Sequence, residues 1–180
     1  MIRDMTRGNV TRHLVSFSVP IILGNLFQLA YNAVDSIVVG RFAGTGALAA
    51  VGTANPVMNI IILGVSGLCI GASVLMSEYF GARDTEKLRR EFAATLFLGL
   101  FFSAAVLALG LPLAGPLLRL LNVPDEIFPQ ARAYLCIIFL GMPFTFVYNA
   151  YAAAMRSVGD SRTPIRFLAL ASVLNAGLDV

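Results

Sequence analysis

Long stretches without a charged side chain constrain this chain more than any other feature. Residues 42–77 contain no Asp, Glu, Lys or Arg, and shorter uncharged stretches cover residues 14–34, 92–118 and 133–155. A helix needs about 20 predominantly apolar residues to cross the hydrocarbon of a bilayer. With 58% hydrophobic and 13% charged residues in a total of 180, so short a chain cannot hide its apolar surface in a water-soluble core. The sequence therefore predicts an integral membrane protein.

The fold class that follows is all-α, a polytopic membrane helix bundle of about five transmembrane helices. We predict these helices at residues 14–39, 55–76, 92–115, 133–155 and 164–180. Glycines at 44, 46 and 52 predict a turn-rich or interfacial segment before the second helix, and Pro112 and Pro116 predict that the third ends or kinks. Thr163 is predicted to cap the fifth helix, with Pro164 in its first turn. Because the chain stops there, we expect it to be truncated within the fifth helix.

The basic residues predict the orientation. Ten of the thirteen Lys and Arg residues lie in the N-terminal segment, the 78–91 hairpin and the 156–166 loop, which alternation of spans places on one side. By the positive-inside rule this side, with the N-terminus, is cytoplasmic. The basic residues form short groups between apolar stretches, which favours a lipid bilayer over a nucleic acid as partner.

Nothing in the residues predicts an enzyme. The single histidine, His13, adjoins the first apolar stretch, and Cys69 and Cys136 lie inside apolar stretches, without the spacing of metal ligands. The sequence also lacks the glycine-rich phosphate-binding motif of nucleotide-driven proteins. We therefore expect no catalytic residue, no metal-ligand cluster and no cofactor.

A polar stripe interrupts the first apolar stretch. Asn25, Gln28, Asn32 and Asp35 are spaced as neighbours on one helix face, and Tyr31 precedes Asp35 by four residues. A carboxylate inside a membrane helix costs about 2.5–3.5 kcal/mol, so its default interpretation is functional. The alternative is that Asp35 anchors the helix end at the outer interface. Since lipid offers these groups no partner, we predict that the stripe faces protein or a wet cavity.

Polar residues recur in the later helices. On the fifth helix Asn175 and the second intramembrane carboxylate, Asp179, lie four residues apart, and Asn149 occupies the fourth helix. Such amides either hold helices together or line a cavity. Pro20 interrupts the first helix and predicts a bend suited to gating. We predict that Asp35 and Asp179 converge in the outer half of the bilayer and together hold one H⁺ or Na⁺.

Several segments, in the same order along the chain, resemble signature elements of one family, the multidrug and toxic compound extrusion (MATE) transporters, in their prokaryotic DinF-like branch. The resemblance covers essentially all 180 residues. The segments, which follow Pro20, are Tyr31–Gly40, Ala47–Gly52, Gly81–Arg83, Arg156–Pro164 and Leu174–Asp179.

The resemblance implies a cation-coupled exporter of small organic, often cationic, substrates in the bacterial inner membrane. Members have twelve helices in two six-helix lobes, so a C-terminal lobe would be missing here. By position, Asp35 and Asp179 would take up H⁺ or Na⁺ with help from Asn175, and Pro20 would bend. The residues that we expect to line or gate the cavity are Pro20, Gln28, Tyr31, Asn32 and Asn149.

Three other functions remain open at this point. A flippase for lipid-linked saccharides belongs to the same superfamily, but it tends to carry basic residues along its cavity, and the predicted spans have none in their interior. An intramembrane aspartyl protease also pairs two aspartates, but Asp179 lacks the GxGD pattern of those enzymes. A non-transporting membrane fragment is the third alternative.

Overall fold

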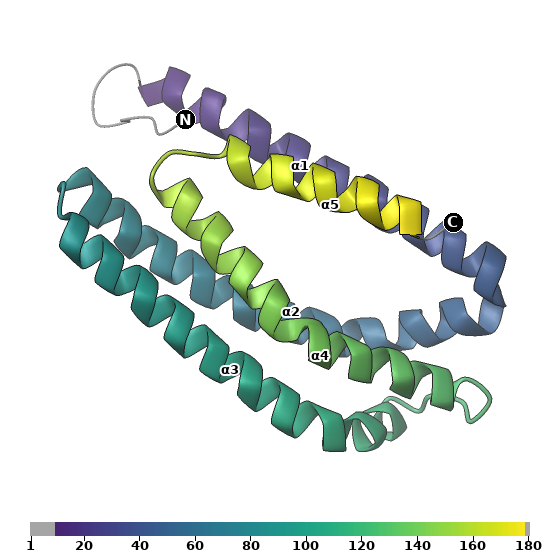
Figure 1. Ribbon diagram of the computed structural model, residues 1–180. Helices are drawn as coiled ribbons and strands as arrows, with labels where there is room; N and C mark the ends of the chain where they lie inside the picture. The colour runs from purple at the N-terminus through teal and green to yellow at the C-terminus, as the bar shows by residue number, and fades with distance from the viewer. Residues whose placement is uncertain (1–9, 179–180) are drawn as a thin grey trace. The chain divides into compact units, whose positions relative to one another are not determined.

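The computed structural model describes residues 10–178, and these residues are helical almost throughout (Figure 1). The elements, in chain order, are α1 (Val10–Val38), the π-helical segment η1 (Val39–Ala43), α2 (Gly44–Gly81), α3 (Thr85–Leu120), α4 (Phe128–Ser157) and α5 (Arg162–Leu178). No strand occurs between residues 10 and 178. The prediction of an all-α membrane bundle is confirmed.

Three helical stretches in the described part of the chain are long and apolar enough to cross a membrane. They are His13–Gly81, which joins α1, η1 and α2, then Thr85–Leu120 and Phe128–Ser157. The described part of α5, with 17 residues, is shorter than these.

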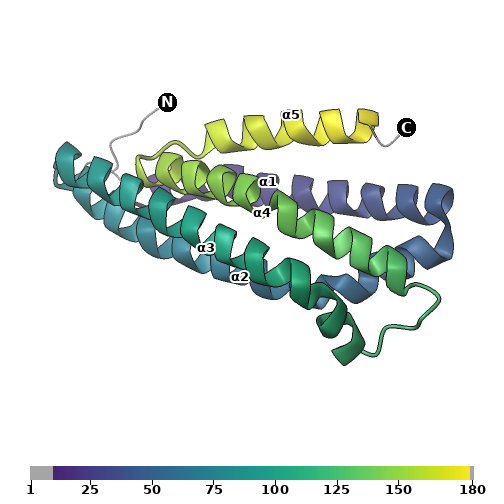
Figure 2. The same cartoon turned by 60° about the horizontal axis from the view of Figure 1, so that its bottom comes forward.

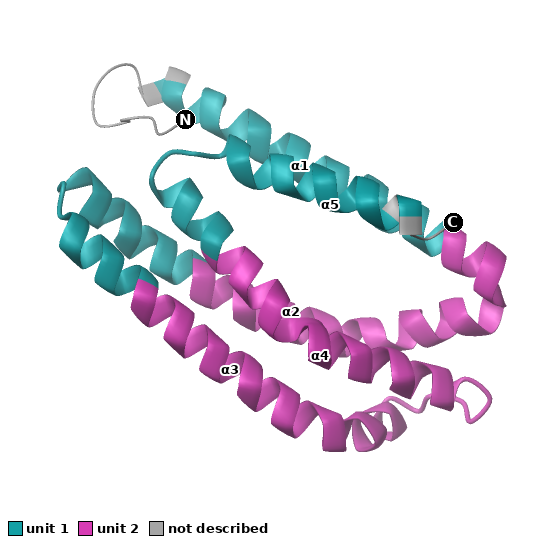
Figure 3. Ribbon diagram, viewed as in Figure 1, with its two compact units in different colours: residues 1–37, 70–92, 151–180 teal, residues 38–69, 93–150 magenta. Residues whose placement is uncertain are grey.

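The chain divides into two compact units (Figure 3). Unit 1 comprises residues 1–37, 70–92 and 151–180, and unit 2 comprises residues 38–69 and 93–150. Within unit 1, α1 and α5 run side by side in the same direction (Figures 1 and 2). Because the two helices are parallel, their C-terminal halves lie next to each other, and the site described below lies between these halves.

Unit 2 holds a core built where α2 begins, α3 ends and α4 begins. Its central residues are at most 8% exposed and come from all three helices and the α3–α4 loop: Ala50, Ala54, Ala114, Leu118, Val123, Ala131, Leu135 and Phe139. Alanines on α2 and α3 meet leucine and phenylalanine on α4. Such pairing of small with large residues fills space at the density of protein interiors.

Glycines of α3 receive aromatic rings of α4 in unit 2. A Cβ added at Gly99 would lie 1.6 Å from Phe146 Cζ, and one at Gly110 would lie 2.9 Å from the Phe139 ring. Both phenylalanines are essentially buried. The close approach of α3 and α4 therefore depends on the missing side chain at these positions.

One predicted helix boundary is wrong. The segment before the second helix is not turn-rich, because α2 is helical from Gly44 onward. Ala50 and Ala54 are buried in the unit 2 core, and a helix satisfies backbone groups that lipid cannot pair. The third helix was expected to end or kink near Pro112 and Pro116. It does not end there, since α3 continues through both to Leu120, but its last turns bend away from the rest of the helix (Figure 2).

The turn between α2 and α3 places Asp84 as the cap of α3. Arg83 takes a positive φ of 59°, and its N–H donates to the Phe80 carbonyl at 3.1 Å. Asp84 Oδ1 then accepts a hydrogen bond from the Lys87 N–H at 3.0 Å. This is the N-cap arrangement that satisfies a free backbone donor at the start of a helix.

The cap of α5 is Asp160 rather than the predicted Thr163. After Gly159 (φ 82°) ends α4, Asp160 Oδ1 accepts hydrogen bonds from the Arg162 and Thr163 N–H groups, both at 3.1 Å. The Thr163 hydroxyl donates to Asp160 Oδ2 at 2.8 Å. Burial by itself raises the pKa of the Asp160 carboxyl, but its hydrogen bonds, among them those from Thr163 and Arg162, favour the ionised form, and the net pKa is lowered below its ordinary value of 3.8.

We predict that Gly99→Ala destabilises the chain by about 1–3 kcal/mol because the new methyl overlaps the Phe146 ring. Heat or SDS unfolding in detergent micelles measures the effect. Gly115→Ala is the matched control, since a Cβ on Gly115 of the same helix meets nothing within 4 Å. Adding Phe146→Leu to Gly99→Ala should restore part of the loss, and an unchanged stability of Gly99→Ala alone would contradict the packing described.

We also predict that Asp160→Ala lowers stability by about 1 kcal/mol through loss of the cap. Because the folded pKa of Asp160 is depressed, this contribution is present above the unfolded pKa of about 3.9 and disappears as pH falls below it toward the folded pKa. Unfolding at pH 7 and pH 3 tests this. Asp125→Ala, in the α3–α4 loop, should change stability little at either pH.

Candidate functional site

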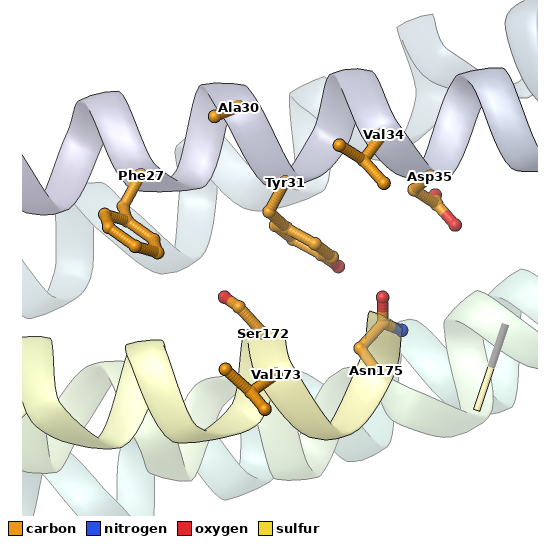
Figure 4. Close-up of a pocket in the computed structure, with 8 residues that line it drawn as sticks. All are labelled: Phe27, Ala30, Tyr31, Val34, Asp35, Ser172, Val173 and Asn175. Carbon is orange, nitrogen blue, oxygen red and sulfur yellow. The ribbon is translucent and has the colours of Figure 1, made fainter. Parts of the chain in front are cut away.

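A cavity of about 250 Å³ lies between α1 and α5 in unit 1 (Figure 4). It occupies the C-terminal half of both helices. The residues that line it come from these two helices alone: Phe27, Ala30, Tyr31, Val34, Asp35, Ser172, Val173 and Asn175.

Three polar groups point into one end of this cavity. The Tyr31 hydroxyl and the Asp35 carboxylate extend from α1, and the Asn175 amide oxygen extends from α5 toward them (Figure 4). Asn175 Oδ1 is buried, and no described residue donates a hydrogen bond to it. A buried acceptor without a donor costs roughly 1–3 kcal/mol, so this oxygen is suited to receive a proton donor or a cation.

The other end of the cavity is apolar, and α1 and α5 close together beyond it. Phe27, Ala30 and Val173 supply its surface. Farther toward the helix N-termini, a Cβ on the buried Gly24 would lie 3.2 Å from Ile165 Cγ1. Glycine at this position lets the two helices touch, and the cavity opens above that contact.

Oxygen atoms dominate the polar chemistry of this site. Carboxylate, amide and phenol oxygens are hard donors of the kind that hold protons and hard metal cations. Asp35 is the one charged side chain among the lining residues that the structure describes. Within residues 10–178, no three His, Cys, Asp or Glu side chains gather as transition-metal ligands would.

Three of the predicted site residues meet in the cavity. Asp35, Tyr31 and Asn175 all line it, as the stripe on the first helix and the polar pair on the fifth led us to expect. Asp179 lies outside the described residues. Gln28 and Asn32 are exposed and do not line the cavity.

The two remaining predicted residues lie elsewhere. Pro20 is half-buried inside α1, which continues without a break on either side of it. Asn149 belongs to unit 2, and its amide nitrogen donates to the Thr145 carbonyl of its own helix at 2.8 Å. Their gating and lining roles stay predictions.

The sequence analysis missed Ser172 and the apolar part of the lining. Ser172 precedes Asn175 by three residues and Phe27 precedes Tyr31 by four, so each shares a helix face with a predicted residue. The Ser172 hydroxyl donates to the Leu168 carbonyl at 2.8 Å. Helical spacing from Tyr31 and Asn175 was the signal that could have found both.

Comparison with known proteins decides the family. The sequence profile of the MatE family matches residues 20–180. The chain belongs to the MatE family. Because its relatives are transporters, we do not regard it as an enzyme.

Individual MatE relatives agree along nearly the whole chain. The probable multidrug resistance protein YpnP of Bacillus subtilis is 37% identical over 175 residues, which are 97% of this chain and 39% of YpnP. An outward-facing multidrug resistance MATE transporter of the MOP superfamily superposes with a TM-score of 0.89 at 30% identity, covering 96% of this chain and 38% of that one.

A MOP superfamily transporter from Pyrococcus furiosus, described as having a binding pocket of reverse polarity, gives the same TM-score of 0.89 at 30% identity over 96% of this chain and 38% of its own. The chain thus spans about two fifths of the length of the MatE proteins that it matches.

We predict that Asn175→Leu stabilises the ion-free chain by about 1–2 kcal/mol, because it removes a buried oxygen without a donor and keeps the branched shape of the side chain. Heat unfolding in sodium-free buffer is the measurement. Asn149→Leu is the control: its amide is already hydrogen-bonded, so this substitution should leave stability unchanged or lower it. A destabilised Asn175→Leu would show that Oδ1 has a structural partner.

Proposed function

We propose that the chain is the N-terminal lobe of a multi-pass exporter that moves small organic cations outward in exchange for H⁺ or Na⁺. The observation that carries the proposal is the cavity in which Asp35 faces Asn175 across α1 and α5. The proposed setting is the bacterial inner membrane with the N-terminus in the cytoplasm, which the distribution of basic residues supports.

Coupling would follow from the charge of Asp35. Its carboxylate lies in a partly buried cavity where electrostatic interactions are stronger than in water. Binding H⁺ or Na⁺ would neutralise it, and the Asn175 oxygen would complete the contact. The bound ion would then favour the arrangement of α1 and α5 that holds it best, as any ligand shifts an equilibrium toward the state it prefers. Pro20 would supply the bend, and Asp179 a second carboxylate.

Transport as proposed needs more protein than these 180 residues. The relatives are about two and a half times as long, which supports a second lobe in the working transporter. Asn25, Gln28 and Asn32 are exposed in the middle of α1, where lipid would leave their amides without partners. A second lobe would cover them and turn this face of α1 into one wall of the pathway, a role that we extend to Asn149.

A cationic substrate fits the described site better than an anionic one. The Pyrococcus relative carries a binding pocket of reverse polarity, so family membership alone does not fix the charge of the cargo. Here the charged lining residue is acidic, and Phe27 and Tyr31 add aromatic surface of the kind that attracts organic cations. The same observation disfavours a flippase for pyrophosphate-linked saccharides.

The test is transport by a chimera in which these residues replace the matching segment of YpnP. In vesicles with an imposed Na⁺ or pH gradient, the chimera should expel ethidium, and the effective gradient identifies the coupling ion. Removing one member of a buried charge interaction costs about 3 kcal/mol or more, so Asp35→Asn should slow gradient-driven efflux about 100-fold.

Ser36→Ala is the matched control for this experiment. Ser36 adjoins Asp35, is exposed, and its hydroxyl donates to the Asn32 carbonyl outside the cavity. It should transport at the rate of the unmodified chimera. Wild-type exchange by Asp35→Asn would refute the proposal.

A further inference from the structure

Exposed arginines gather at one end of unit 1, outside the site described above. The α2–α3 and α4–α5 turns lie at the same end of this unit (Figures 1 and 3). Arg83 and Arg89 extend from the first of these turns and the helix after it, and Arg162 and Arg166 from the first turns of α5. All four are exposed, and none forms an ion pair within the part of the chain that the structure describes.

Acidic residues near these turns compensate the basic ones only in part. Asp84 pairs with Lys87 at 3.0 Å, and Glu86 pairs with Arg90. Asp160 accepts the hydrogen bonds that cap α5. In total, five acidic residues (Glu78, Asp84, Glu86, Glu91 and Asp160) stand against seven basic ones (Arg83, Lys87, Arg89, Arg90, Arg156, Arg162 and Arg166), so this end of the unit keeps a positive excess.

One face of α5 continues from its two arginines into apolar surface. Leu170 and Leu174 follow Arg162 and Arg166 on the same side of the helix, given about 100° per residue. They are 57% and 59% exposed. The helix meets α1 through its opposite side, which carries Ile165 and Asn175. The two guanidinium groups of Arg162 and Arg166 therefore lie at the N-terminal end of a row of exposed apolar side chains on α5, which we call the apolar column.

We propose that this face of α5 binds an anionic phospholipid, with its phosphate at Arg162 and Arg166 and an acyl chain along the column below. Guanidinium groups bind phosphate through several charge-assisted hydrogen bonds, and basic residues next to a membrane span attract anionic headgroups. The apolar column distinguishes a lipid from free phosphate, which has no part that could cover it. Arg83 and Arg89 add positive potential at the same headgroup level.

Lipid contact can be measured because the chain has no tryptophan. With Leu170→Trp as a single reporter, the full chain in lipid nanodiscs is compared in brominated phosphatidylglycerol and brominated phosphatidylcholine at equal mole fraction. Quenching should favour the anionic lipid. Each arginine next to an anionic membrane surface changes the affinity for anionic lipid about fivefold. The double variant Arg162→Gln with Arg166→Gln should therefore reduce the preference for phosphatidylglycerol over phosphatidylcholine about 25-fold.

Two matched controls belong to this experiment. Arg41→Gln with Arg132→Gln removes the same charge from unit 2 and should keep the preference at position 170. Tryptophan at position 144, where Phe144 of α4 is 79% exposed, should be quenched equally by both lipids. If the double glutamine variant fails to incorporate, the two single variants should each lose about fivefold.

Four outcomes would overturn the proposal. The first is equal quenching by both lipids in the unmodified reporter. The second is an anionic preference that survives loss of both arginines. The third is relief of quenching by millimolar inorganic phosphate, which would make the arginines a site for free phosphate. Absence of quenching by either lipid in the YpnP chimera would mean that another helix covers the face, and would equally reject a lipid there. Ethidium efflux is measured separately, so failure here leaves the exporter proposal standing.

Discussion

Lipid offers no hydrogen bonds, and this constraint organises the structure at every level. The backbone must pair internally, so helices continue where water-based rules would end them: α3 runs through Pro112 and Pro116, and α2 includes the glycine-rich residues 44–52. Polar side chains obey the same rule. Serines and threonines inside the helices, such as Ser103, donate to carbonyls of the preceding turn. A buried polar group without a hydrogen-bond partner inside the protein marks a position where a ligand can bind.

Close packing in this chain depends on residues that lack side chains. Apolar side chains gain little from meeting one another when the surrounding lipid is equally apolar, so shape decides which helices associate. Gly99 and Gly110 admit the rings of Phe146 and Phe139 in unit 2. Gly24 admits Ile165 in unit 1. Larger residues, Phe27 and Tyr31, follow this contact on α1 and line the α1–α5 cavity.

The sequence was sufficient to predict the fold class, because uncharged stretches are a strong signal, and three of its candidate residues (Tyr31, Asp35 and Asn175) line the α1–α5 cavity. It was not sufficient to predict which face of α1 turns inward. The polar stripe of Asn25, Gln28 and Asn32 lies roughly 100° around the helix from the lining residues, and of the polar residues predicted on α1 only Tyr31 and Asp35 line the cavity. Apolar periodicity could not correct this, since α1 is apolar on nearly every side. The α5 cap was misplaced because Thr163 and Asp160 are both good caps, and only the turn geometry after Gly159 selects Asp160.

The Asn175 oxygen, which accepts no hydrogen bond from a described residue, lowers the stability of the ion-free chain and favours the proposed ion binding. A cavity whose polar groups satisfied one another completely would be more stable, but it would gain nothing from an arriving ion. Leaving one acceptor unpaired beside a carboxylate raises the energy of the empty state and makes ion binding the way to relieve it. Because the cost falls on α1 and α5 alone, binding acts on the relation between these two helices and not on the unit 2 core. Such a local and reversible cost is what an ion needs in order to shift one helix against another.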